Sequence, residues 1–149
     1  MFKPARILVP TDFSKYSDTA LKTAIDIAKQ FNSKIYLLHV IDKSLQQSFS
    51  DYSMNPEVMV RFKSDSFKVA NEQLEQEVTR ISKSKKLEVT FGIKEGTPYD
   101  VILKEQKANK IDLIVISSHG RTGIMKHLIG SVAEKVMRGA KCPVLLVKA

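Results

Sequence analysis

The strongest chemical signal in the sequence is a short polar segment rich in glycine and hydroxyl side chains. It reads Ser117-Ser118-His119-Gly120-Arg121-Thr122-Gly123, and Gly130-Ser131 follows just before a helical pattern. Glycine allows a backbone to approach a ligand closely, and a helix start presents unpaired N–H groups and a positive dipole end to an anion. Neither a Walker phosphate loop nor the dinucleotide glycine fingerprint occurs in the chain. The segment therefore favours an anion site that uses neither of these common motifs.

Asp12 is a second candidate, because it is a charged residue that closely follows the apolar run Ile7–Pro10. Its carboxylate could accept hydrogen bonds from ribose hydroxyls or help to hold a metal ion. The histidines give weaker signals: His39, His119 and His127 lack metal-ligand spacing, so we expect no structural metal. His119 fits either a ligand contact or a hydrogen bond that stabilises its loop. No serine has a recognisable His and acid arrangement, so nucleophilic catalysis is unsupported.

The elements that must position these residues alternate between two patterns. Short apolar runs predict buried strands at residues 6–10, 34–41, 87–93, 111–116 and 144–147. Between them, apolar residues at helical spacing predict four helices. The first begins near Ser14 or Ser17, and the second runs from Pro56 to about residue 82. The third begins at Pro98, and the fourth follows an N-cap at Ser131. The apolar positions of the second helix, which we expect to lie in the core, include Met59, Phe62, Val69 and Leu74.

This alternation predicts an α/β fold with a five-stranded parallel sheet and helices on both faces. Right-handed crossovers favour a doubly wound sheet with the order 3-2-1-4-5, within a single domain that spans residues 1–149. Ligands of such sheets bind outside the carboxyl ends of the strands, where the strand order reverses. That crevice, between the first and fourth strands, brings Pro10-Thr11-Asp12 together with Ser117–Arg121.

Composition narrows the classes of partner and compartment. The net charge is +8, but the lysines are spread along the chain, and the dense run Lys83–Lys86 falls at a predicted helix end, where the dipole favours cations. We therefore expect a solvated basic surface rather than a nucleic-acid interface. Cys142 has no cysteine partner, which fits a reducing compartment. No apolar run is long enough for a signal peptide or a membrane span, so the expected location is the cytoplasm, with no membrane contact.

Several segments taken together closely resemble the universal stress protein family. They are Ile7–Ser14, Leu37–Val40, Ser117–Gly123, Gly130–Val136 and Cys142–Val147. The resemblance covers essentially the whole chain and is most specific in the C-terminal third. It implies the same five-stranded architecture that the alternating pattern predicts.

The resemblance also implies a nucleotide site. ATP-binding members of the family carry a glycine, two residues, a second glycine, nine residues, and then glycine with serine or threonine. Gly120, Gly130 and Ser131 match this pattern, whereas its first position is Ser117. By resemblance, the residues near ribose and adenine are Asp12 and Val40, with Pro10, Thr11 and Ile116 close by. Those around the phosphates are Gly120, Arg121, Gly130, Ser131 and Val132.

The function implied is a cytoplasmic regulatory protein of the stress response that binds ATP, or AMP or ADP, with Mg²⁺ or Mn²⁺ on the phosphates. Two other functions stay open: the same fold acting only through an unknown protein partner without nucleotide, and slow ATP hydrolysis. The departure at Ser117 favours the former, and the lack of an identifiable general base argues against the latter. The apolar last strand, Val144–Val147, is an exposed pairing edge, and the resemblance implies that it pairs antiparallel with a second copy in a homodimer.

Overall fold

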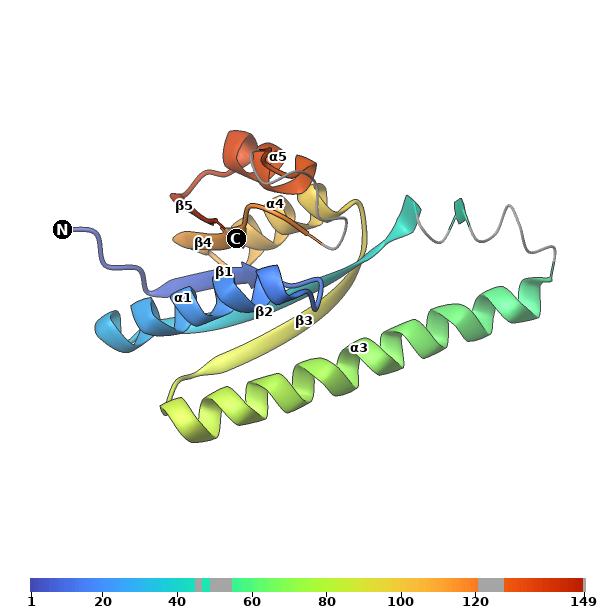
Figure 1. The fold of residues 1–149 in the computed structure, drawn as a ribbon, viewed down its shortest axis with the longest axis horizontal. Coiled ribbons are helices and arrows are strands. Elements are labelled where there is room, and N and C mark those ends of the chain that lie inside the picture. The colour runs from blue at the N-terminus through green and yellow to red at the C-terminus, as the bar shows by residue number, and fades with distance from the viewer. Residues whose placement is uncertain (45–46, 49–54, 121–127, 149) are drawn as a thin grey trace.

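Five parallel strands form the centre of the protein. The computed structural model describes residues 1–44, 47–48, 55–120 and 128–148. The strands are β1 (Arg6–Pro10), β2 (Lys34–Asp42), β3 (Val89–Gly96), β4 (Leu113–Ser117) and β5 (Val144–Val147). They pair in parallel in the order β3-β2-β1-β4-β5, which confirms the predicted topology (Figure 1).

Four helices cover the two faces of this sheet: α1 (Lys15–Phe31), α3 (Pro56–Lys85), α4 (Pro98–Ala108) and α5 (Ser131–Gly139). Alternation along β1 shows the division, since Ile7 and Val9 pack in a cluster with α1 and α3, whereas Leu8 packs in a cluster with α4 and α5. All three side chains are fully buried. The predicted cover of helices on both faces is therefore confirmed.

The helix starts follow the predicted capping residues with one correction. Ser14 caps α1, and its hydroxyl accepts a hydrogen bond from the Ser17 N–H at 3.2 Å. The predicted N-cap at Ser131 is wrong, because Gly130 is the N-cap of α5 and Ser131 is its first helical residue. The Gly130 N–H donates to the Ser118 carbonyl at 2.8 Å, and its backbone is extended, so the helix begins one residue later than the serine pattern indicates.

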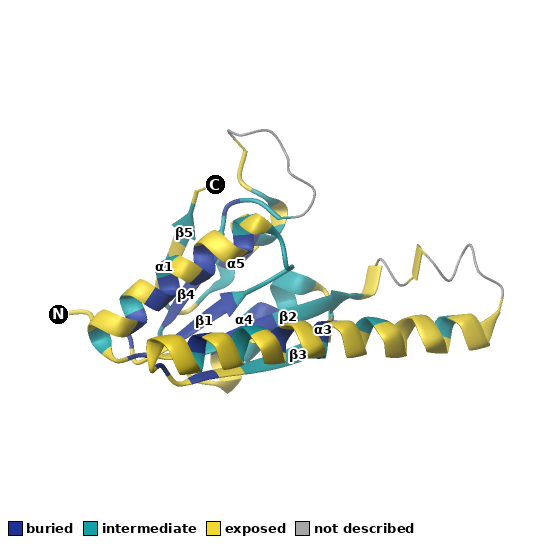
Figure 2. Ribbon diagram, turned by 60° about the horizontal axis from the view of Figure 1, so that its bottom comes forward, coloured by how far each residue is buried: buried dark blue, intermediate teal, exposed yellow. Residues whose placement is uncertain are grey.

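Helix α3 departs most from the sequence expectation. Its buried residues are Ala70, Leu74 and Ile81, all at or beyond the middle of the helix. The first half extends past the sheet (Figures 1 and 2), so Phe62 and Val69 are 38% and 53% exposed rather than in the core. Helical spacing identifies a shared face, but it does not tell whether another element reaches that face.

Within the described residues, no helix is long and apolar enough to cross a membrane.

Candidate functional site

The loop after β1 is held in place by its own polar groups. The Thr11 N–H donates to the Leu38 carbonyl at 2.8 Å, and the Thr11 carbonyl lies 2.8 Å from Nδ1 of His39. Asp12 accepts a hydrogen bond from the Ser14 N–H at 3.0 Å through Oδ1. Phe13 has a φ of 63°, and the centroid of its ring lies 4.5 Å from the centroid of the His39 ring. These contacts fix the Asp12 carboxylate at the carboxyl end of β1, and they give His39 a positioning role that the sequence did not indicate.

The described part of the loop after β4 is held in place in a similar way. The Ser117 hydroxyl donates to the His119 carbonyl at 2.8 Å, and the Ser118 hydroxyl lies 2.8 Å from Nδ1 of His119. The Ser118 N–H donates to the Val147 carbonyl at 2.9 Å. His119 thus makes the loop-stabilising hydrogen bond that was one of its two expected roles. Ser118 is 3% exposed, and no pattern in the sequence distinguishes it from its neighbouring serine.

The two loops meet, as the predicted crevice requires. A Cβ atom added to Gly120 would lie 2.9 Å from Oδ2 of Asp12. A Cβ atom added to Gly130 would lie 3.2 Å from the Ser118 carbonyl oxygen. Neither glycine has φ in the left-handed region, so lack of space, rather than backbone conformation, explains both. The structure therefore brings β1, β4 and the start of α5 together at one edge of the sheet.

Within the described part of the chain, no acceptor is found for the first N–H groups of α5, which lie at this edge. The first hydrogen bond along the helix runs from the Glu134 N–H to the Gly130 carbonyl, at 3.0 Å. The N–H groups of Ser131 and Val132 precede it, and the N-cap Gly130 has no side chain to accept from them. Glu134, in the first turn, is drawn into an ion pair with Arg138 at 2.9 Å. The helix N-terminus is thus suited to an anion.

Apolar side chains form a wall beside Asp12 and the start of α5. Ile116 is 5% exposed in the cluster beneath α4 and α5, and Val40 and Val132 are partly buried against the same cluster. Pro10 ends β1 in the middle of the sheet and is partly exposed. Apolar side chains beside a few hydrogen-bonding groups are the usual lining of a site for a small molecule or cofactor.

Comparison with known proteins identifies the family of this chain. The model of the universal stress protein family matches residues 4–148. The chain belongs to the universal stress protein family. A universal stress protein of Methanocaldococcus jannaschii is 37% identical over 150 residues, which cover 96% of this chain and 81% of that protein.

Solved structures of the family share the fold. A second universal stress protein of M. jannaschii, 29% identical in the structural comparison, has a TM-score of 0.85, with coverage of 99% of this chain and 98% of that one. A universal stress protein family protein from Arabidopsis thaliana, solved with AMP bound, has a TM-score of 0.66 at 23% identity and covers 97% of this chain and 91% of its own.

Ser117 stands at the first position of the glycine pattern that the resemblance implies for ATP-binding members of the family. Among the described residues, the non-glycine positions with positive φ are Phe13, Asn32, Lys86 and Lys110, so Ser117 carries no strain of that kind. Strand alternation places it on the α1 face with Leu113 and Val115, whereas Ile116 faces α4 and α5. Its side chain is thus directed away from the apolar wall.

Some predictions lie outside the part of the chain that the structure describes, namely those for Arg121 and His127. The described residues contain no group of three or more His, Cys, Asp or Glu side chains that could hold a metal ion. Burial, followed by the charge of Asp112, raises the pKa of the Cys142 thiol, in keeping with a packing residue rather than a nucleophile.

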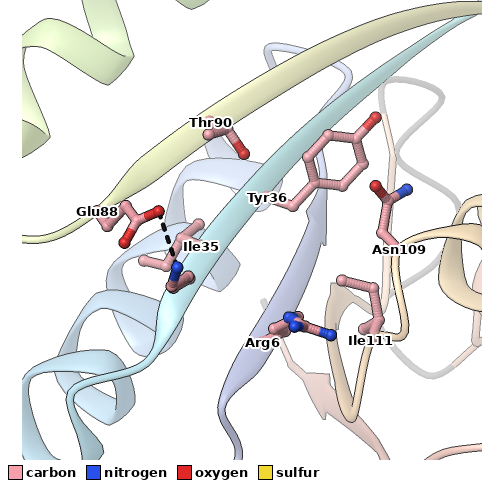
Figure 3. A pocket seen from close by; sticks show the side chains of 8 residues that line it. Arg6, Ile35, Tyr36, Glu88, Thr90, Asn109 and Ile111 are labelled. Atoms are coloured by element: carbon pink, nitrogen blue, oxygen red, sulfur yellow. Dashed lines mark ion pairs between the residues drawn. The ribbon is translucent and has the colours of Figure 1, made fainter.

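The universal stress protein also has two pockets that the sequence did not predict. One, of about 250 Å³, lies between α1 and α3 and reaches Thr11 and Phe13. The other, of about 170 Å³, lies at the opposite edge of the sheet, where Figure 3 shows Arg6, Tyr36 and Asn109 around it.

Proposed function

We propose that this universal stress protein binds an adenine nucleotide (ATP, ADP or AMP) at the carboxyl edge of its sheet and acts as a cytoplasmic regulator of the stress response. The observation that carries the proposal is the close approach of Asp12 to Gly120 beside the open N-terminus of α5. The Arabidopsis relative solved with AMP bound supports a nucleotide as the ligand of this fold.

Each group has a role in this proposal. Asp12 accepts hydrogen bonds from the ribose hydroxyls, because its carboxylate is anchored by the Ser14 N–H through one oxygen. Val40 and Ile116 contact the adenine, and the N–H groups of Ser131 and Val132 donate to the phosphates. Pro10, Thr11, Gly120 and Gly130 give the close backbone approach, with Arg121 beside the phosphates. Mg²⁺ or Mn²⁺, when bound, neutralises charge on the phosphates.

The proposed role is binding and regulation rather than catalysis. The two described histidines near the site are engaged by the protein, His39 at the Thr11 carbonyl and His119 at the Ser118 hydroxyl. Neither is proposed as a general base for hydrolysis, which requires a base within hydrogen-bond reach of the attacking water.

Calorimetric titration with ATP and with AMP tests the site. Gly130→Val should weaken binding at least about a hundredfold, equal to about 2.7 kcal/mol, because its side chain has to fit beside the Ser118 carbonyl at the start of α5. Lys22→Ala, on the exposed face of α1, should leave the affinity unchanged. Gly130→Ala, whose single methyl group demands a smaller shift, should be intermediate, and it replaces the valine variant if that variant fails to fold. Parent protein that binds neither nucleotide, or Gly130→Val that binds like the parent, rejects the proposal.

We further propose a twofold homodimer that pairs β5 of one copy with β5 of another. β5 is an edge strand of the sheet, and Leu145 in it is 38% exposed. An exposed apolar edge strand is a pairing hazard unless it is covered. Light scattering at tens of micromolar should give the mass of a dimer, and Leu145→Lys should give that of a monomer. A parent protein that is monomeric at this concentration contradicts the proposal.

A further inference from the structure

The amino edge of the sheet, opposite the proposed nucleotide site, collects positive charge from five separate parts of the chain. Because every strand is parallel, each segment that joins a helix to the next strand comes to this edge. Backbone hydrogen bonds tie neighbouring segments together, as from the Asp112 N–H to the Arg6 carbonyl at 3.1 Å and from the Ile35 N–H to the Glu88 carbonyl at 3.0 Å.

The charge at this edge exceeds that of the whole protein. Residues 1–6, 29–34, 83–88, 107–112 and 138–143 hold eleven of the 24 Lys and Arg residues and two of the 16 Asp and Glu residues. Their net charge is therefore +9, against +8 for the chain, so all other residues together are near neutral at −1. The lysines that look dispersed in sequence are gathered by the fold.

Local compensation does not account for this charge. The helix C-termini at this edge carry roughly half a negative charge each, or about −2 for four helices. All eleven basic side chains are exposed. Within the described part of the chain, two of them form ion pairs: Lys34 with Glu88 at 3.1 Å and Arg138 with Glu134 at 2.9 Å.

The edge also has a hollow where an anionic group can be held. The pocket of about 170 Å³ opens here, with the Arg6 guanidinium at its rim and the polar ends of Thr90 and Asn109 around it (Figure 3). Tyr36 crosses its wall and donates its hydroxyl to Glu105 at 2.7 Å. Glu88, the acidic residue in the lining, is paired with Lys34.

We propose that this basic edge is a docking surface for the phosphate backbone of double-stranded nucleic acid. Five strands about 4.8 Å apart make an edge about 19 Å wide, which spans roughly eleven phosphate charges of a duplex. Nine of the eleven basic side chains are lysines, which meet phosphates as point charges, and Phe2 is the one strongly exposed large aromatic side chain in these segments that could stack on unpaired bases. The contact is therefore to phosphates and is independent of base sequence.

Other polyanions fit the surface less well. Stable attachment to a membrane combines cations with inserted apolar groups or a lipid anchor, and Met1 and Phe2 are the exposed large apolar residues in these segments. An acidic peptide presents a few carboxylates on a flexible chain, whereas a duplex presents a rigid array of charges that many dispersed lysines contact at once. Lysine also suits this role, because it meets a phosphate as a point charge.

The test measures fluorescence anisotropy of a labelled duplex of about 20 base pairs between about 50 and 200 mM salt. Lys85→Gln, Lys107→Gln and Lys141→Gln combined remove three exposed cations ahead of β3, β4 and β5. The affinity at about 50 mM salt should fall at least about tenfold, and the slope of log K against log salt should become shallower by about 2.7.

The matched control combines Lys22→Gln, Lys43→Gln and Lys68→Gln, which remove the same charge from exposed positions elsewhere. This triple should change duplex affinity by less than about threefold, since screening weakens distant charges. Melting temperatures verify the fold, and the single variant Lys107→Gln, with a slope change of about 0.9, serves if the triple is unstable. The proposal fails if the parent does not bind the duplex, if both triples lose affinity equally, or if phosphatidylserine vesicles or polyglutamate bind more tightly than the duplex. Gly130→Val should bind the duplex like the parent, which separates this surface from the nucleotide site.

Discussion

The two edges of the same sheet differ in almost every chemical respect. At the carboxyl edge, short loops bring together Asp12, glycines without room for a side chain, and the open N–H groups of α5. At the amino edge, the helices end, their last turns carry Lys29, Lys83, Lys85, Lys107 and Arg138, and the backbone groups are paired between neighbouring segments. One edge is built from backbone and the other from long charged side chains.

The difference follows from the direction of the chain. In a parallel sheet every crossover helix runs back to the start of the next strand, so all N-termini of the helices lie at one edge and all C-termini at the other. The positive dipole ends and unpaired N–H groups favour a small anion in a fixed place. The negative dipole ends favour cations that need no fixed place. The first arrangement gives specificity, and the second gives attraction that depends on salt.

Of the variants that compare the two edges, Asp12→Asn should cause the largest loss of ATP affinity. The amide keeps Oδ1 for the Ser14 N–H but loses the charge that strengthens hydrogen bonds to ribose hydroxyls. ATP affinity should fall about tenfold to a hundredfold, or about 1.4–2.7 kcal/mol. The same comparison with 2′-deoxy-ATP and 3′-deoxy-ATP should show a smaller loss for whichever nucleotide lacks the hydroxyl that Asp12 contacts. An equal loss with all three nucleotides would place Asp12 away from the ribose.

Gly120→Ala and Gly139→Ala make the same chemical change at opposite edges. The new Cβ atom at 120 would lie 2.9 Å from Oδ2 of Asp12, so the carboxylate has to shift, and ATP affinity should fall by about threefold to tenfold. The new Cβ atom at 139 would lie 2.6 Å from Cδ1 of Leu103, near the amino edge. That variant should lose some thermal stability with unchanged ATP affinity. If calorimetry shows the same affinity for both variants, the close approach of Gly120 to Asp12 has no part in binding.

The fold could be predicted from sequence because its signals are local and repeated. The central strands β1 and β4 are short apolar runs. Each helix begins with a capping residue or proline that the structure confirms, except at Ser131. The sequence failed where a distant contact decides. Phe62 and Val69 have helical spacing, but they are 38% and 53% exposed in the first half of α3 rather than buried in the core. The start of α5 depends on the Ser118 carbonyl, which lies twelve residues earlier.

The candidate site was predictable in its location rather than in its detail. Topology alone brings Asp12 to the loop after β4, and the structure confirms that the two meet. The engagement of His39 with the Thr11 carbonyl depends on the register of β1 against β2, which no local pattern fixes. The basic amino edge was missed for a similar reason, because charges far apart in sequence become neighbours only when five strands align.

Ser117→Gly tests whether the departure from the family's glycine pattern has a cost. The serine has no positive φ, and its hydroxyl donates within its own loop to the His119 carbonyl at 2.8 Å. Restoring glycine should therefore change ATP affinity by less than about tenfold, or about 1.4 kcal/mol. Titration of parent and variant decides this. Binding by the glycine variant alone would show that Ser117 had moved this protein to a branch of the family that acts without nucleotide.

The smallest expected effect tests whether the two edges are independent. β1 has five residues, so the edges lie about 16 Å apart along it, well beyond the Debye length of about 8 Å at physiological salt. The combined Lys85→Gln, Lys107→Gln and Lys141→Gln variant should then bind ATP within about twofold of the parent at that salt. At about 10 mM salt the Debye length rises to about 30 Å, so the same lysines attract the nucleotide and their removal should weaken binding a few-fold. A large loss at physiological salt would instead mean that the fold, rather than the field, couples the two edges.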